Sequence, residues 1–284
     1  IHQFERPHRK PADGFGNRIL RIGESNTMIS CHVDTVHSQG GVQDIHVSKG
    51  IVSLAKPSKP KANPRLGQRF IGKKPTYFRD CLGSDDAAGM YAAMRLIAAK
   101  KPGLYVFHRG EERGGLGSAW IAKNTPELLN GIDRCIALDR RGQTDIITHQ
   151  MMGQCCSDTF ASALASELNL GHKGCPFGSF TDSANYTDFI SECTNVSVGY
   201  QKEHSSAETI DTDYLETLIE SLISADLDNL PAVRECWEND DYRTSFKPFQ
   251  RQMYTLEDTA YQLRSKDVLA GHLRLARGYL DKFA

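Results

Sequence analysis

Five short segments of the chain carry side chains that bind divalent metal ions well. They are His32-Val33-Asp34, Gly83-Ser84-Asp85-Asp86, Glu111-Glu112, Asp139 and His204. Imidazole nitrogens and carboxylate oxygens are the ligands that Zn²⁺ takes in hydrolytic sites. Two histidines and several carboxylates together match the requirement of a site that holds two divalent ions and activates water.

Four of these segments closely follow a short apolar run, and such runs predict buried strands. The runs lie at 27–31, 104–107, 135–138 and 195–200. In open α/β sheets, ligands bind beyond the carboxyl ends of the strands. We therefore expect the five segments to converge on one edge of a sheet.

Each segment alone has a simpler explanation. His32 and Asp34 could form an exposed turn, Asp85 could stabilise a helix N-terminus, and Glu111 and Glu112 could belong to a solvated acidic loop. The other two segments could be one ion pair and one exposed histidine. The order and placement of the whole set, rather than any single motif, indicate a metal site.

Two pairs of nearby residues, Glu111-Glu112 and His32-Asp34, could each combine a metal ligand with a second group of a different role. Neighbouring side chains in a loop diverge, so one carboxylate of Glu111-Glu112 can bind metal while the other takes a proton from water and returns it to a leaving amine. A metal-binding histidine usually donates its second ring nitrogen to an oxygen. Asp34 lies on the same side of the strand end as His32, which makes it a candidate orienting group.

Composition limits the classes of function. The chain has 284 residues, 39% hydrophobic and 24% charged, which is ordinary for a globular domain with a large core. A formal net charge of -1 gives no electrostatic reason to expect nucleic acid or a membrane surface as partner. The eight cysteines lack a framework spacing and a Cys-x-x-Cys pair, which favours free thiols and a cytoplasmic location.

Alternating strands and helices predict a three-layer α/β/α fold with a mixed, mostly parallel central sheet. Strands are expected at two places within 18–33, in a hairpin over 43–55 around Lys49-Gly50, and at 103–108, 134–139, 145–149 and 195–200. Helices are expected over 85–100, through Trp120, and over 157–169, 183–191 and 212–226.

The remaining segments read as loops or as an extension. The stretches 56–76, which is basic, and 171–179 are expected to be loops. Residues 1–230 are expected to form the catalytic domain, and 231–284 a helical C-terminal extension or the last layer of the same domain.

The order of these motifs resembles that of the zinc-dependent exopeptidases with a co-catalytic dinuclear site, which include leucyl aminopeptidase-like and peptidase T-like enzymes and related deacylases. This resemblance implies that His32 and Asp139 are terminal ligands of one ion and that Glu112 and His204 are terminal ligands of the other. Asp85 would bridge the two ions.

The resemblance covers residues 25–225 and implies further roles. Glu111 would be the general base, Asp34 would orient His32, and the Asp85-Asp86 peptide bond would be cis. The hairpin followed by Leu82-Gly83-Ser84-Asp85-Asp86 is similar to the tripeptidase branch. Only 65 positions separate Asp139 from His204, so a separate lid domain is not expected there.

The sequence thus favours an aminopeptidase with two divalent ions, Zn²⁺ first and Co²⁺ or Mn²⁺ as alternatives, acting on a peptide or peptide-like substrate. A deacylase or carboxypeptidase of the same fold remains open, because the candidate anchors for a substrate carboxylate are Arg109, Arg113, Arg140 and Arg141. A glutaminyl-cyclase-like acyltransferase with one zinc, and an inactive binding protein on this fold, are less favoured because the full ligand set and Glu111 are present. The oligomeric state is left open.

Overall fold

The computed structural model describes residues 12–37, 43–55, 81–150 and 153–236, and the structural statements below concern these residues. The predicted basic loop at 56–76 lies outside them. So does the predicted C-terminal extension from residue 237 onward, and the proposed domain boundary near residue 230 therefore stays a prediction.

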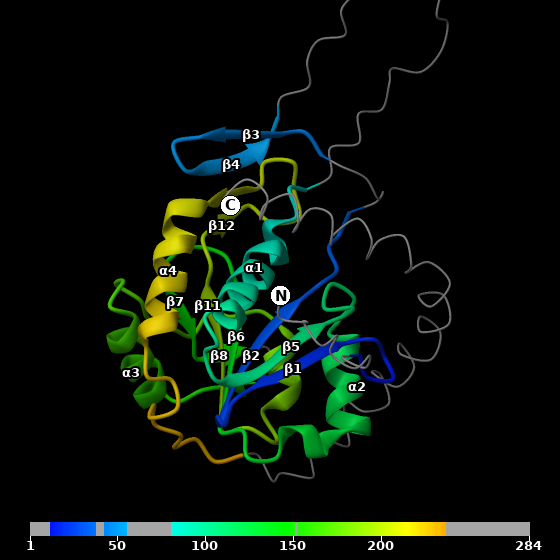
Figure 1. Ribbon diagram of the computed structural model, residues 1–284, viewed down its shortest axis with the longest axis vertical. Coiled ribbons are helices and arrows are strands. Elements are labelled where there is room, and N and C mark those ends of the chain that lie inside the picture. The colour runs from blue at the N-terminus through cyan, green and yellow to red at the C-terminus, as the bar shows by residue number, and fades with distance from the viewer. Residues whose placement is uncertain (1–11, 38–42, 56–80, 151–152, 237–284) are drawn as a thin grey trace, which may run out of the picture.

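The central element is a seven-stranded sheet, shown in Figure 1. Its order is β1 (Arg18–Ile22), β5 (Gly103–His108), β2 (Thr27–His32), β6 (Arg134–Arg140), β11 (Glu192–Ser197), β7 (Asp145–Ile147) and β10 (Lys173–Cys175). The central strands β5, β2, β6 and β11 are parallel, whereas β1 and β7 run antiparallel to their inner neighbours. The predicted mixed, mostly parallel sheet is confirmed.

Successive residues of the central strands face opposite layers of the molecule. Ile29 packs into a cluster with α1 (Ser84–Ala98), α3 (Asp158–Leu168) and α4 (Thr212–Ser224). Its neighbour Met28 packs into the opposite cluster, with α2 (Leu116–Asn124) and the short 3₁₀ helices η1 (Pro126–Leu129) and η2 (Asp182–Tyr186). Burial on both faces requires the continuous apolar runs from which the strands were predicted.

A second, four-stranded sheet lies beside the ends of α1 and α4. Its order is β12 (Tyr200–Gln201), β13 (Thr209–Asp211), β4 (Ile51–Leu54) and β3 (Ile45–Ser48). Lys49 and Gly50 both have positive φ, 50° and 74°, so they form the tight hairpin turn that the sequence predicted. This small sheet holds the segment between β12 and β13, which contains His204 (Figure 1).

Three local predictions were wrong or incomplete. The helix expected over 183–191 is only the 3₁₀ turn η2, in a segment where Ser, Asn and Thr side chains compete for backbone groups. The predicted loop 171–179 contains the edge strand β10, and β11 begins at Glu192, three residues before its predicted start. Short edge strands and a buried strand that starts with a charged residue carry little sequence signal. A small pair, β8 (His149–Gln150) and β9 (Gly153–Gln154), completes the strands.

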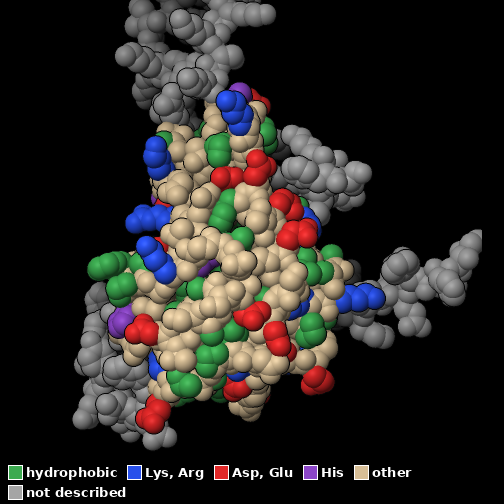
Figure 2. All heavy atoms as spheres, turned by 90° about the vertical axis from the view of Figure 1, so that its left-hand side faces the viewer, with side chains coloured by type: hydrophobic (Ala, Val, Ile, Leu, Met, Phe, Trp, Pro, Cys, Tyr) green, Lys and Arg blue, Asp and Glu red, His purple; other side chains and the backbone are tan. Residues whose placement is uncertain are grey.

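The surface over α3 and α4 intermingles acidic, basic and apolar side chains, as Figure 2 shows. All eight cysteines are free, as their spacing predicted. In the described part of the chain, no helix is long and apolar enough to cross a membrane.

Candidate metal centre

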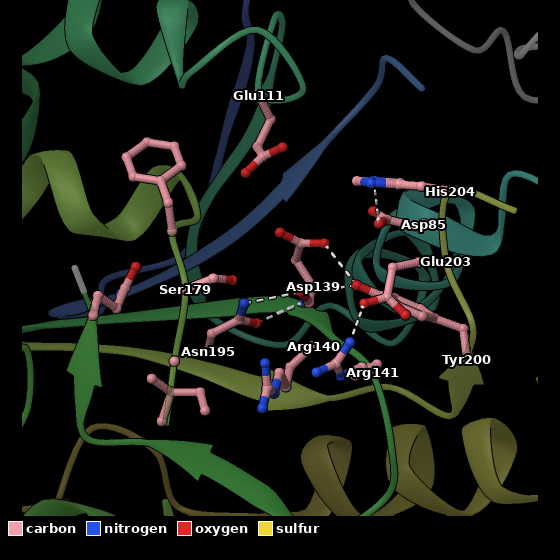
Figure 3. Close-up of a pocket in the computed structure, with 14 residues that line it drawn as sticks. Asp85, Glu111, Asp139, Arg140, Arg141, Ser179, Asn195, Tyr200, Glu203 and His204 are labelled. Carbon is pink, nitrogen blue, oxygen red and sulfur yellow. Dashed lines mark hydrogen bonds and ion pairs between the residues drawn. The ribbon is translucent and has the colours of Figure 1, made fainter. Parts of the chain in front are cut away.

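The parallel strands place three of the five predicted segments on the same edge of the sheet. His32 is the last residue of β2, Asp139 is the penultimate residue of β6, and Glu111-Glu112 follows the end of β5. The neighbouring strands β2 and β5 are in parallel register up to their last pair, His32 and His108. Asp85 reaches the same edge from the start of α1, and His204 from the loop after β12 (Figure 3).

The side chains form two donor groups that share Asp85, and a third that combines His32 with Glu111 and Glu112. In the first, Nε2 of His32 lies 3.0 Å from Oδ1 of Asp85 and 3.4 Å from Oδ1 of Asp139. In the second, Nε2 of His204 lies 3.1 Å from Oδ2 of Asp85 and 2.9 Å from Oε1 of Glu112. Within each group the donor atoms lie within 4.8 Å of one another. The grouping matches the ligand pairs that the sequence resemblance implied.

Glu111 lies next to these groups and is largely buried. Its Oε2 is 3.9 Å from Nε2 of His32. Burial raises the pKa of Glu111 well above its ordinary value, and the nearby Asp139 adds to the shift although His32 opposes it. A carboxylate with a raised pKa beside the reacting groups is suited to take and return a proton.

Several side chains of the centre have raised pKa values. Burial and the Asp85 charge raise the pKa of Glu112 to about 7. The hydrogen bond to Asp85 raises the pKa of His204 to about 9, although partial burial opposes the shift. Burial also raises the pKa of Asp139. A site that retains protons on several ligand atoms fits divalent cations, which replace such protons when they bind.

His204 itself adopts an unusual backbone conformation. Its φ of 58° lies in the left-handed region, which non-glycine residues seldom occupy. Such conformations persist where the surrounding structure enforces them, and they gather at functional sites. The conformation turns the imidazole toward Asp85 (Figure 3).

Asp34 contacts His32 in a way that differs in detail from the prediction. The closer partner of Nδ1 of His32 is the main-chain oxygen of Asp34, at 2.9 Å, whereas the Asp34 carboxylate lies 3.7 Å away. Oδ1 of Asp34 instead accepts hydrogen bonds from the amides of Gly110 and Glu111, at 2.8 and 3.1 Å. Asp34 therefore contacts both the first histidine and the loop that carries the candidate base.

Asp139 is held by three residues that the sequence analysis did not assign to the site. Its carboxylate accepts hydrogen bonds from Thr181 Oγ1 at 2.6 Å and from the Tyr200 hydroxyl at 3.1 Å. Asn195 pairs with the main chain of Asp139, accepting from its amide and donating to its oxygen. Asn195 lies in β11, whose sequence ECTNVS is itself largely polar, so no distinct sequence signal identifies its amide.

Glu208 holds the segment that carries Asp85 and was also missed. Its fully buried carboxylate accepts hydrogen bonds from the amide of Gly83 at 3.0 Å, from Ser84 Oγ at 2.5 Å and from the amide of Asp85 at 3.1 Å. The Asp85-Asp86 bond is cis, as the resemblance implied. No spacing rule marks a glutamate four positions after a metal-binding histidine as a support for a segment so far away in the sequence.

A cavity of about 100 Å³ opens over this centre. Its lining includes Asp85, Glu111, Asp139, His204, Tyr200, Asn195, Gln150, Ser179, Glu203, Arg140 and Arg141. The two arginines are paired with carboxylates: Arg140 Nη2 lies 3.0 Å from Asp145, and Arg141 Nη1 lies 2.8 Å from Glu203. Of the four arginines proposed as carboxylate anchors, these two line the cavity.

No protein-family model matches this sequence, and no curated protein matches it significantly. The fold, however, resembles solved peptidases. Aminopeptidase PepT from Bacillus cereus matches with a TM-score of 0.53 and 15% identity, over 74% of this chain and 83% of that one. A tripeptidase from Staphylococcus aureus matches with a TM-score of 0.50 and 13% identity, over 73% and 82% of the two chains. The chain therefore has the fold that the resemblance over residues 25–225 implied.

Proposed function

We propose that this protein is a metallo-exopeptidase that uses two divalent ions, Zn²⁺ first and Co²⁺ or Mn²⁺ as alternatives, to remove N-terminal residues from short peptides. The observation that carries the proposal is the pair of donor groups that share Asp85 beside Glu111. Asp85, Asp139, His204 and Glu111 all line the same cavity. The solved structures with this fold that support it are described as an aminopeptidase and a tripeptidase.

His32, Asp85 and Asp139 would hold one ion, and Asp85, Glu112 and His204 the other. When bound, two such ions would polarise the scissile carbonyl and lower the pKa of the attacking water. The donor set of two imidazoles and three carboxylates suits Zn²⁺.

The chain's own residues supply proton transfer and alignment. Glu111 would accept the proton of the attacking water and then deliver it to the nitrogen of the leaving peptide. The amides of Gly110 and Glu111, held by Asp34, fix the position of this base. Thr181 and Tyr200 hold Asp139 in one orientation, so the ligand is already aligned before an ion arrives.

A deacylase or carboxypeptidase would need a free cationic group for the substrate carboxylate. The two arginines that line the cavity are both already paired with carboxylates. This pairing favours the aminopeptidase, because its substrate presents a positively charged amine near the ions and needs no free arginine. A cytoplasmic location remains an expectation from the sequence.

The test compares a short peptide with its N-acetylated form, using protein stripped with a chelator and then reloaded with Zn²⁺, Co²⁺ or Mn²⁺. We expect hydrolysis of the free peptide to depend on added metal, with about two ions bound per chain. Acetylation should remove nearly all activity because the charged amine no longer anchors the scissile bond. Equal or faster cleavage of the acetylated peptide would replace the aminopeptidase with the deacylase or carboxypeptidase.

A further inference from the structure

One part of the cavity wall is a continuous uncharged segment. Gly178-Ser179-Phe180, between β10 and η2, lines the cavity that also contains the candidate ligands and the candidate base. Figure 3 shows Ser179 below Glu111 and on the opposite side of Asp139 from the Asp85-His204 pair. This neutral wall suits the uncharged main chain of a peptide, whereas a charged amine is better placed beside the acidic groups.

The mechanism proposed above gives the direction in which a bound peptide continues. The amine nitrogen and the scissile carbonyl carbon are bonded to the same Cα, so they lie about 2.5 Å apart and the amine stays beside the ligands. Glu111 would deliver its proton to the leaving nitrogen, so the rest of the peptide continues from Glu111. Ser179 lies on that side of the cavity (Figure 3). This reasoning rests on the proposed aminopeptidase.

The Ser179 hydroxyl is accessible and available for a ligand. Ser179 is exposed, and its side chain makes no hydrogen bond to the residues that the structure describes. A hydroxyl can donate one hydrogen bond, and peptide carbonyl oxygens are acceptors. A substrate that enters the cavity can therefore reach this donor without displacing another partner.

The main chain on both sides of Ser179 is held in place. The amide of Gly178 donates to the main-chain oxygen of His149 at 3.2 Å, and the amide of Thr181 donates to Oε1 of Gln150 at 3.1 Å. A Cβ on Gly178 would lie only 2.4 Å from the same His149 oxygen, so the segment packs directly on its neighbour. A donor on a fixed backbone loses little conformational freedom when a ligand binds.

We propose that the Ser179 hydroxyl donates a hydrogen bond to the main-chain carbonyl oxygen of the second substrate residue, which follows the scissile bond. Thr181, two positions further along the chain, holds the candidate ligand Asp139. Two residues of extended chain span about 7 Å, and a scissile carbonyl at the ions and the next carbonyl of the substrate fit within that length. Ser179 then makes the enzyme favour peptides over simple amides of amino acids.

The experiment compares two substrates that differ in this carbonyl. Leucyl-glycinamide carries it, and leucine propylamide has a carbon chain of the same length without it. Both have the free amine and the same first residue. The variants are Ser179→Ala and, as a matched serine-to-alanine control, Ser166→Ala, whose exposed hydroxyl donates to Ser162 in α3. Metal content and Tm are measured for every variant.

We expect Ser179→Ala to lower kcat/KM for leucyl-glycinamide about 3- to 10-fold, which is the effect of one neutral hydrogen bond. The loss should come mainly through KM, because the bound substrate already makes this contact. For leucine propylamide, kcat/KM should stay within about twofold of wild type, and so should metal content. Ser166→Ala should match wild type on both substrates.

Two results would overturn the inference. If Ser179→Ala leaves kcat/KM unchanged for both substrates, the hydroxyl does not contact the peptide. If it lowers kcat/KM equally for both, Ser179 acts on the scissile carbonyl or on the ligands and not on the second residue. A zinc-loaded wild-type protein that cleaves acetylated leucyl-glycinamide as fast as the free form would instead refute the proposed function itself, before any variant is compared.

Discussion

The contacts of Glu208 predict what its replacement by glutamine should cost. Oε1 accepts from Ser84 Oγ and from the amide of Asp85, and Oε2 accepts from the amide of Gly83. In Glu208→Gln the side-chain carbonyl oxygen can take the place of Oε1 and still accept from Ser84 Oγ and from the Asp85 amide. The new NH₂ group then faces the Gly83 amide, so one hydrogen bond to a charged group is lost and a buried donor is left unsatisfied.

Losing one charged hydrogen bond and leaving one buried amide unpaired together cost about 2 to 4 kcal/mol. For a domain of this size that corresponds to a fall in Tm of about 5 to 15 °C. The same change loosens the segment that carries Asp85, so the affinity for both proposed ions should also drop. Denaturation in the presence of a chelator measures the loss of stability. A zinc titration by calorimetry measures the loss of metal affinity.

Glu216→Gln is the matched control, because Glu216 is partly exposed and pairs with Arg95 on the surface of α1 and α4. It should cost less than about 1 kcal/mol. If Glu208→Gln unfolds within 1 kcal/mol of wild type and binds zinc equally well, Glu208 does not position the bridging carboxylate.

Two further predictions concern the site. Glu111→Gln should reduce kcat about 10²- to 10⁴-fold with both ions retained. Glu112→Gln should instead weaken metal binding first. Steady-state kinetics with elemental analysis of each variant measures both effects, and the opposite pattern would show that the two roles are reversed. The pKa is raised to about 7 at Glu112, about 8 at Asp182 by burial, and about 9 at His204 through its hydrogen bond to Asp85. These groups bind more protons when folded, so the stability they contribute is present at low pH and is lost as the pH rises from about 5 to 9. Chelator-treated protein should therefore melt at lower temperature as the pH rises, and the gain in Tm on adding zinc should grow. A Tm that does not change with pH would contradict the raised pKa values of these groups.

The sequence predicted the central sheet because its strands are buried on both faces. Continuous apolar runs such as the one ending at His32 leave few alternatives, and residues at the carboxyl ends of parallel strands meet at one edge of the sheet. The roles of Asp34 and Glu208 were harder to predict because they depend on three-dimensional contacts. The contact between Glu208 and Asp85 spans 123 positions and involves backbone amides, which have no sequence signature.

The segment 183–191 was predicted to be a helix, and the structure has only the 3₁₀ turn η2 there. Tyr186 and Ile190 in this segment are both fully buried. The chain forms only a 3₁₀ turn there, and it places the buried Asp182 against Ser118. Local polar contacts determined the backbone, and the hydrophobic pattern alone could not reveal them.

The two donor groups draw on parts of the chain that are made at very different times. His32 ends β2 and is synthesised well before His204 and Glu208, which lie between β12 and β13. A nascent chain that ends before this loop has the first donor group but lacks His204, one of the three side chains of the second. Contacts of such high sequence separation form late, because the loops between them must first close. We therefore expect the proposed ions to bind only after the segment between β12 and β13 has packed against the central sheet, so that metal binding follows the folding of that sheet instead of nucleating it.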